Sequence, residues 1–564
     1  MRSPLAIILA VLGLGGLAAA AYFMDLPAYF VQNKEITVAV DSSGPDSLPT
    51  PLFPDPNRID FVDEEGDSFS IELINPTYLS NERRNYYGDS LPDKLDVIWQ
   101  LTLGSGKTQV GRTIKNWSGA GWTGQPLMVI ENGKKYIIQG AFDHRLKKID
   151  YETGEVIWQY RFDDVVKGTG SLWINHKADS LKDRVLVLQG TRAGGKLNAP
   201  IVDCYRAISY FTGEERWRVN SPRTRCYSRD VDGSALIIND TAYLPLETSI
   251  FTVFNPDPKA AKMKDGLLQP EFYRFQDTLY RDADASVHGG NVVSEASPVR
   301  LRDHIYLASG SGRVWGYNMK NPGMDWEYFI GSDIDGSPVV TDDSCILVSV
   351  EKQYIKGQGG ILKLDPSKKP EDATVWYMPV KNRKFVGWLG GVIGTAATNE
   401  ASRKAGQPHI GATIGIDGYT YFFDLNKVDT QKVTLFDGER KVPTPKVYYK
   451  HRTGPAIASP IIIGNRAAVP TYQGFYLFEF DDQMNFKLLD KKEFSAEATP
   501  FVDQGRIFIA SRDGNLYCLG RSDAPTKRVN SIYGKTEVNP KNGKLKRYWK
   551  GELQPIEGTK EVKK

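Results

Sequence analysis

A turn-and-strand motif that recurs along this chain constrains its fold more than any other feature. Residues 150–158 (DYETGEVIW) reappear as residues 209–217 (SYFTGEERW), and in each copy a Thr-Gly turn leads directly into a strand that contains a Trp. Strands and turns that repeat about every 40–50 residues are typical of the blades of a β-propeller. Fold and function therefore have to be inferred from the repeat as a whole.

A second recurring element marks the first strand of each repeat and allows the repeats to be counted. It has the form x-[Ala/Gly]-[Ser/Thr]-Pro and is followed by an apolar strand, a turn and a second apolar strand. Clear and looser copies together predict eight blades, with first positions at Thr123, Thr169, Asp232, Glu295, Asp335, Leu389, Ile457 and Glu497.

The outermost strands of the repeats give an independent count. Seven of them follow the N-terminal region, with a Trp, Tyr or Leu in the matching place: Trp158, Trp217, Tyr273, Trp326, Trp376, Tyr449 and Leu488. The eighth is predicted at residues 97–100 (VIWQ), which are identical to residues 156–159. A propeller that closes with its own N-terminal strand leaves no open sheet edge. We therefore predict an all-β, eight-bladed propeller over residues 96–520.

The pattern Asp-x-x-Thr-Gly-x-x-x-Trp, as it stands at residues 150–158, resembles the quinoprotein-type propeller repeat. That family includes pyrroloquinoline quinone (PQQ) dehydrogenases and non-catalytic propellers that assist outer-membrane protein assembly. The catalytic branch typically carries an adjacent Cys-Cys pair over its cofactor, and this chain has none. It also needs a Ca²⁺ site and a catalytic Asp, for which only Glu295, Asp333 and Asp335 can be nominated. The resemblance therefore favours the non-catalytic branch.

The N-terminal region predicts export. Residues 5–23 are uncharged and apolar and follow Arg2. About 20 such residues span a bilayer as a helix, whereas the apolar part of a cleaved signal is about 7–15 residues long. We therefore predict a transmembrane anchor over residues 1–24, with the propeller on the periplasmic side of a bacterial inner membrane. The alternative is cleavage near residues 18–20 (AAA), which would leave a periplasmic or secreted protein.

Two further segments flank the predicted propeller. Residues 25–95 are rich in Pro, Asp and Ser, which predicts a linker or irregular segment. Residues 521–564 hold 12 Lys or Arg against 5 Asp or Glu, and such a basic tail is either a solvated extension or a contact for an acidic partner or lipid. Because the basic residues gather there and not on an aromatic face, we expect no nucleic-acid partner.

The four cysteines, Cys204, Cys226, Cys345 and Cys518, stand far apart and form no CxxC. Zinc-ribbon, thioredoxin-type and c-type haem motifs are thereby excluded. Cys204 and Cys226 would form a disulfide in an oxidising compartment, or remain two buried thiols.

Acidic residues gather where the predicted innermost strands begin. Those strands line the channel of a propeller, so the eight first positions should lie near one channel mouth. Four of them are carboxylates, namely Asp232, Glu295, Asp335 and Glu497. Two near-identical copies, residues 230–234 (DVDGS) and 333–337 (DIDGS), add an Asp two residues earlier, which strand alternation points to the same side.

Carboxylates that lie this close repel one another unless a cation or a basic group lies among them. Oxygen-only ligands at adaptable spacing suit Ca²⁺ better than a transition metal. We therefore predict that Asp232, Glu295, Asp335 and Glu497 bind a cation or a basic segment of a partner. The alternative is a set of solvated acids that cap the strand starts.

These observations lead to one interpretation and two alternatives. We interpret the chain as a membrane-anchored, extracytoplasmic scaffold that binds envelope or membrane proteins. One alternative is a PQQ- and Ca²⁺-dependent quinoprotein dehydrogenase. The other is a propeller that senses a cation or another ligand.

Overall fold

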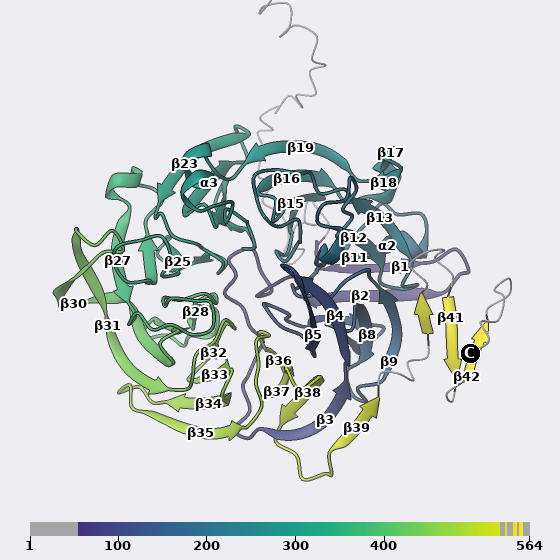
Figure 1. Cartoon of the computed structure of the whole chain (residues 1–564). Helices are drawn as coiled ribbons and strands as arrows, with labels where there is room; N and C mark the ends of the chain where they lie inside the picture. The colour runs from purple at the N-terminus through teal and green to yellow at the C-terminus, as the bar shows by residue number, and fades with distance from the viewer. Residues whose placement is uncertain (1–54, 531–535, 539–544, 550–551, 556–564) are drawn as a thin grey trace, which may run out of the picture. The chain divides into compact units, whose positions relative to one another are not determined.

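Eight blades of four strands each follow one another around a ring, each formed almost entirely from one repeat of the sequence (Figure 1). Six blades are separate four-stranded sheets, whereas blade 1 lies within a nine-stranded sheet and blade 8 within a five-stranded one. The computed structural model describes residues 55–530, 536–538, 545–549 and 552–555. These lie in the unit formed by residues 53–564. The prediction of an all-β, eight-bladed propeller is confirmed.

The first four blades have the following strands. Blade 1 contains β6 (Leu127–Glu131), β7 (Lys134–Gly140), β8 (Arg145–Asp150) and β9 (Val156–Arg161); blade 2 contains β10 (Ser171–Ile174), β11 (Val185–Gly190), β12 (Tyr205–Ser209) and β13 (Glu215–Val219); blade 3 contains β14 (Leu236–Ile238), β15 (Thr241–Pro245), β16 (Ile250–Asn255) and β19 (Glu271–Thr278); blade 4 contains β20 (Val299–Leu301), β21 (His304–Ser309), β22 (Arg313–Asn318) and β23 (Gly323–Phe329).

The other four blades complete the ring. Blade 5 contains β24 (Val339–Val340), β25 (Ile346–Val350), β26 (Gly360–Leu364) and β27 (Thr374–Pro379); blade 6 contains β28 (Ala397–Thr398), β29 (Ile410–Ile414), β30 (Tyr419–Thr434) and β31 (Lys441–Arg452); blade 7 contains β32 (Ile461–Ile463), β33 (Arg466–Thr471), β34 (Gly474–Phe480) and β35 (Phe486–Lys492); blade 8 contains β36 (Phe501–Asp503), β37 (Arg506–Ala510), β38 (Asn515–Gly520) and β3 (Asp96–Thr102). Two short helices, α2 (Leu181–Arg184) and α3 (Asp282–Val287), and two hairpins, β4 (Ser105–Val110) with β5 (Thr113–Ser118) and β17 (Lys262–Lys264) with β18 (Leu267–Gln269), lie between these strands.

The N-terminal strand closes the ring. β3 pairs antiparallel with β38, so the outermost strand of blade 8 comes from the beginning of the propeller sequence. The predicted strand at residues 97–100 lies within β3. This closure is confirmed.

The repeated Trp and Thr-Gly residues join each blade to the next. The indole Nε1 of Trp99 donates to the carbonyl oxygen of Tyr151 at 2.9 Å, and that of Trp158 donates to Tyr210 at 2.9 Å. The acceptors stand just before the Thr-Gly turns. Gly154 has φ +72°, and a Cβ built on it would lie 2.9 Å from the Trp99 ring, so the turn glycine makes room for the neighbouring indole.

The x-[Ala/Gly]-[Ser/Thr]-Pro element marks the entry to each innermost strand. Its Ser or Thr links the innermost strands of consecutive blades. The backbone N–H of one such residue donates to the hydroxyl of the next, in the order Ser234 to Ser297, Ser297 to Ser337, Ser337 to Thr395 and Thr395 to Ser459, at 2.8–3.0 Å. The link through Thr395 places the entry of blade 6 at Ile393, four residues after the Leu389 that the sequence suggested. That alignment was wrong because the glycine pair at residues 390–391 imitates the small-residue position.

Residues 76–87 cross the end of the channel and contact all eight blades; we call this segment the plug. Tyr78, Arg84 and Tyr87 are fully buried in it. Its hydrogen bonds reach Gln125, Ser171, Ala235, Pro298, Val340, Thr398, Ser459 and Val502, one residue in each blade. One mouth of the channel is therefore closed by the chain itself.

The segment predicted as a linker, residues 25–95, differs from that expectation in its described part. β1 (Arg58–Val62) pairs with β2 (Ser68–Asn75), and β2 pairs with the innermost strand of blade 1. The plug then follows. The linker prediction needs correction from residue 58 onward, because the polar and proline-rich composition conceals side chains that are buried against several blades at once. Residues 25–54 lie outside the described residues.

The basic tail also contains strands. β39 (Lys527–Asn530) pairs in parallel with β3, and β40 (Thr536–Val538) pairs in parallel with β9. β41 (Leu545–Trp549) and β42 (Glu552–Pro555) extend the sheet beyond β40. The tail therefore adds to the outer edges of blades 8 and 1.

Two further predictions concern the N-terminus and the cysteines. The predicted transmembrane segment lies outside the described residues, and among those that are described no helix is long and apolar enough to cross a membrane. All four cysteines are free thiols, so the alternative of a Cys204–Cys226 disulfide is wrong.

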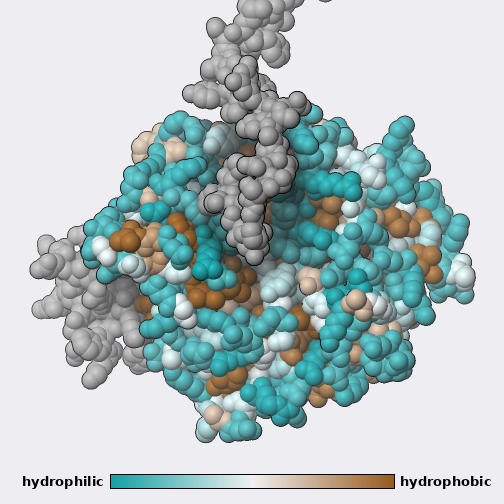
Figure 2. All heavy atoms as spheres, turned by 180° about the vertical axis from the view of Figure 1, so that it is seen from behind, coloured by the Kyte–Doolittle hydropathy of each residue, from teal (hydrophilic) through white to brown (hydrophobic). Residues whose placement is uncertain are grey.

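Seen from behind, the described surface is mostly hydrophilic, with small patches of hydrophobic residues (Figure 2).

Candidate cation-binding cavity

The central channel contains a cavity of about 820 Å³. The innermost strands run from this cavity toward the plug: Glu295 lines the cavity, and the carbonyl of Pro298, three residues later, accepts a hydrogen bond from Arg84. In blade 5, Asp335 lines the cavity and the backbone N–H of Val340 donates to the carbonyl of Arg83 in the plug. The cavity thus lies beyond the plug and is approached from the opposite face of the ring.

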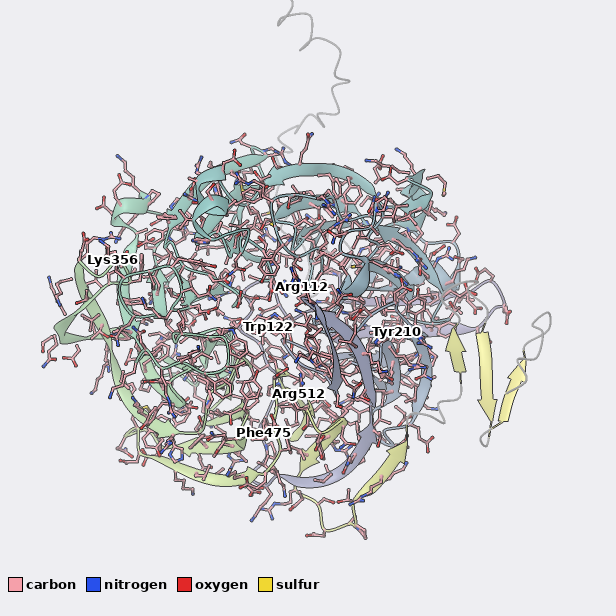
Figure 3. The ribbon with its side chains drawn as sticks, viewed as in Figure 1. Arg112, Trp122, Tyr210, Lys356, Phe475 and Arg512 are labelled. Atoms are coloured by element: carbon pink, nitrogen blue, oxygen red, sulfur yellow. The ribbon has the colours of Figure 1, made fainter. Side chains whose placement is uncertain are left out.

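The hairpin β4–β5 contributes to the lining at that opposite face. Its tip residues Gln109, Val110 and Gly111 line the cavity, and Trp117 at its base packs against Phe142 with ring centroids 5.3 Å apart. Arg112 at the tip, Trp122 and Arg512 are labelled near the centre of the ring in Figure 3. The lining therefore comes from blade entries, from loops after the second strands, and from this hairpin.

Two groups of carboxylates face each other across neighbouring blades. In each group, one oxygen from every member lies within 4.8 Å of the others. The first triad is Asp232, Glu247 and Glu295; the second triad is Asp333, Asp335 and Glu351. Three of the four predicted site residues, Asp232, Glu295 and Asp335, therefore lie in these triads.

The first triad contains a basic side chain of the protein itself. The Lys167 ammonium forms an ion pair with Asp232, whose side chain is fully buried. Burial opposes the charged form of Lys167, but the carboxylates of Asp232, Glu295 and Glu247 raise its pKa well above the usual value. Arg192 pairs with Asp230 at 2.8 Å beside this triad. Lys167 therefore compensates part of the negative charge here, although Asp232 Oδ1 and Glu247 Oε1 are also buried without a hydrogen-bond partner among the described residues.

The second triad contains no such group. Its hydrogen-bond donors are two neutral amides, Asn291 to Asp333 at 2.7 Å and Gln353 to Glu351 at 2.6 Å. Among the described residues, the buried oxygens Asp333 Oδ1, Glu351 Oε2 and Asn291 Oδ1 accept no hydrogen bond. A buried polar atom without a partner is costly, and a cation would supply what these three oxygens lack.

Burial raises the pKa values of acids in both triads. Burial, followed by the charge of neighbouring acids, raises the pKa of Glu351 to about 9 and that of Asp333, Asp335 and Glu247 well above their usual range. Burial raises the pKa of Glu295 only to about 7, because Lys167 opposes the shift.

The fourth predicted residue lies elsewhere on the same cavity. Glu497 lines it from blade 8 and pairs with Arg512 at 2.8 Å, apart from either triad. Sequence reasoning also missed Glu247 and Glu351. Glu351 directly follows β25, the second strand of blade 5, and Tyr472 directly follows β33, the second strand of blade 7. An alignment of second-strand ends would therefore have indicated these cavity positions.

A third group of possible ligands lies away from the cavity. Asp342, Glu400 and His409 also have one atom each within 4.8 Å of the others. Their contacts explain the group without a metal: His409 Nδ1 lies 2.9 Å from Glu400, Glu400 accepts the backbone N–H of Asp342, and Asp342 pairs with Arg83 of the plug. We assign it a structural role.

No protein-family model and no curated protein matches the chain. Solved structures do. BamB from Moraxella catarrhalis has 15% identity and a TM-score of 0.45, with 76% of this chain and 100% of that chain covered. A quinohemoprotein alcohol dehydrogenase from Comamonas testosteroni has 12% identity and a TM-score of 0.47, with 80% and 81% covered. These TM-scores lie below 0.5, so the eight-bladed fold rests on the strand topology described above.

A europium-containing methanol dehydrogenase gives a similar result, with 11% identity, a TM-score of 0.46, and 78% of this chain and 91% of that chain covered. At these identities and TM-scores the likenesses carry no argument about function. The function therefore has to be argued from the cavity.

Proposed function

We propose that this chain is a non-catalytic binding propeller whose cavity takes a cation at Asp333, Asp335 and Glu351. The observation that carries this proposal is the set of three buried oxygens, on Asn291, Asp333 and Glu351, that accept no hydrogen bond from the described residues. The ligand atoms are all oxygens, which suits a hard cation such as Ca²⁺. Ca²⁺ is also the simplest probe of the site.

The charge of the cavity supports a cation rather than an anion. Seven carboxylates line it, against the three basic residues Lys167, Arg192 and Arg512. Each of the three basic residues already pairs with an acid, namely Asp232, Asp230 and Glu497. Among the described lining residues, no basic side chain is therefore left without an acidic partner to bind an incoming anion.

The same argument bears on the quinoprotein alternative. PQQ is a planar tricarboxylate and needs basic groups for its carboxylates. The lining offers no basic side chain without an acidic partner, and the chain has no adjacent Cys-Cys pair. These residues do not fit the cofactor, and we derive no reaction through it.

The cellular setting of the proposal is the bacterial envelope. The uncharged apolar segment at residues 5–23 supports an inner-membrane anchor with a periplasmic propeller. Loops on a rigid ring suit the binding of envelope or membrane proteins, so the cation site would serve a scaffold. Co-purification of envelope proteins with the full-length chain, and their loss from a chain without residues 1–24, tests this setting.

Thermal unfolding of the full-length protein tests the cation site. After treatment with EDTA, millimolar CaCl₂ is expected to raise the melting temperature by a few degrees, because a ligand that binds only the folded state stabilises it by about 2.7 kcal/mol at 100 times its Kd. The Asp335→Asn/Glu351→Gln double variant should lose this response.

Asp325→Asn provides the matched control, because Asp325 pairs with His304 at an exposed position on the outer part of blade 4. This variant should respond to CaCl₂ as the unmodified protein does. An unchanged melting temperature in all three proteins, or an equal rise in all three, would contradict the proposed site.

A further inference from the structure

Part of the cavity lining is apolar and aromatic. Six of the seven lining acids come from blades 3, 4 and 5 and from the residues that lead into them, and the seventh, Glu497, leads into blade 8. One apolar part of the lining comes from the entries or loops of blades 1, 6 and 7 and contains Trp122, Trp388, Ile393, Ile457 and Tyr472. We call this set the aromatic wall. The cavity therefore combines clustered acids with an apolar surface, beside which Glu497 pairs with Arg512.

The aromatic wall is held in place by its own packing. Trp388 stacks on Phe385 with centroids 6.3 Å apart and an interplanar angle of 12°, and Phe385 packs on Tyr472 at 5.2 Å. Trp122, Ile393 and Ile457 belong to the same apolar cluster. An organic ligand would thus meet a preformed apolar surface, which lowers the cost of binding.

Trp122 supplies an observation that points independently to a ligand. Its side chain lines the cavity, and the residue is only 7% exposed. Its indole Nε1 is buried, and among the described residues no acceptor lies within hydrogen-bond distance. Buried Trp N–H groups usually have a partner, so a ligand with an oxygen acceptor would satisfy this one.

The size of the cavity also exceeds what a bare ion needs. Pockets for small molecules are typically about 300–1,000 Å³, and this cavity is about 820 Å³. The plug closes one end of the channel, so a ligand that enters from the other face is enclosed on the remaining sides. An ion alone would leave the aromatic wall without a contact.

We propose that the cation taken by this cavity is a small organic amine that carries an apolar or aromatic body and an oxygen acceptor. Its ammonium group donates to Asp333, Asp335 and Glu351, which offer oxygens for its three N–H bonds. Its body lies on the aromatic wall, where Trp388 and Tyr472 offer it apolar contact area. This inference rests on the proposed function, since it names the class of cation for the same carboxylates.

Tyramine is a suitable probe because it combines an ammonium, an aromatic body and a hydroxyl acceptor. Isothermal titration of the full-length, EDTA-treated protein should give one tyramine per chain with a Kd below about 1 mM. CaCl₂ should compete, because both cations use the second triad. The uncharged analogue 4-ethylphenol should bind at least ten-fold more weakly.

Two variants distinguish the contribution of the second triad from that of the aromatic wall. Glu351→Gln and Trp388→Ala should each weaken tyramine at least ten-fold, while Trp388→Ala leaves the response to CaCl₂ unchanged. Tyr273→Ala is the matched control, because Tyr273 is an exposed aromatic on the outermost strand of blade 3. If Trp388→Ala fails to fold, as judged by melting, Tyr472→Leu tests the same wall.

The outcomes distinguish the two proposals. Binding of CaCl₂ without tyramine would overturn the organic amine and leave the cation site intact. Equal tyramine affinity in the Trp388→Ala and Tyr273→Ala variants would also overturn it. Absence of binding by both ligands would overturn both proposals.

Discussion

The two carboxylate triads face the same cavity from neighbouring blades, yet the protein treats their charge differently. The first triad, Asp232, Glu247 and Glu295, receives the ammonium of Lys167 from the loop that leads into blade 2. The second triad, Asp333, Asp335 and Glu351, receives only amide donors from Asn291 and Gln353. Among the described residues, the first triad thus has a resident basic partner and the second has none, although both contain buried oxygens without a hydrogen-bond partner.

Under the proposed function, this difference separates acids that serve the fold from acids that serve a ligand. A buried carboxylate is costly unless it is neutralised, and Lys167 is a resident partner for Asp232 of the first triad. The second triad would be neutralised by protons or by an added cation.

Removal of the resident cation should give the largest effect. Lys167→Met leaves the buried Asp232 without its partner, and breaking a buried pair in this way costs about 3–5 kcal/mol of unfolding free energy. Chemical denaturation at pH 7 measures the loss. CaCl₂ should restore part of it, because the first triad then resembles the second.

Lys177→Met is the matched control for this comparison. Lys177 pairs with Asp240 at 3.0 Å, but its side chain is 78% exposed, so the change should cost less than about 1 kcal/mol. An equal loss of unfolding free energy in the Lys167→Met and Lys177→Met variants would show that Lys167 does not neutralise a buried cluster.

The pH dependence of stability should reveal the second triad. Because the pKa of Glu351 is raised from 4.5 in the unfolded chain to about 9 in the fold, its contribution is fully present below pH 4.5 and is lost as the pH rises toward 9. We expect the unfolding free energy to decrease across this window without added cation, with a slope of at most about 1.4 kcal/mol per pH unit for this group.

Glu351→Gln sharpens this test, because it replaces a titrating acid with a neutral amide of the same shape. Its unfolding free energy should change less between pH 5 and pH 9 than that of the unmodified protein. A parallel pH profile for the two proteins would show that Glu351 is already ionised in the fold.

The two triads also show what the sequence could and could not predict. Asp232, Glu295 and Asp335 could be predicted because they occupy the same place in successive repeats. The hydrogen bonds between the Ser and Thr residues that follow them fix that register. Glu351 was missed because second-strand ends were not aligned. Lys167 precedes its blade in an irregular loop, and no spacing in the sequence relates it to Asp232 across one blade.

The sequence of the plug gave even less indication of its structure. Its hydrogen bonds go to eight different sheets, so its side chains follow no strand or helix period. Composition alone therefore made residues 76–87 look like a linker. The ring itself was predictable because each Trp and Thr-Gly pair acts locally, between adjacent blades, and repeats with the chain.

The smallest expected effect concerns Asn291, a neutral residue beside the second triad. Its amide donates to Asp333, and its own oxygen accepts no hydrogen bond from the described residues. Asn291→Ala should weaken CaCl₂ binding about ten-fold, equivalent to about 1.4 kcal/mol, measured by calorimetric titration. Asn291→Lys should instead abolish binding, because it would give the second triad the resident ammonium that the first already has. Retained CaCl₂ binding in a folded Asn291→Lys protein would show that the two triads do not differ through their resident charge.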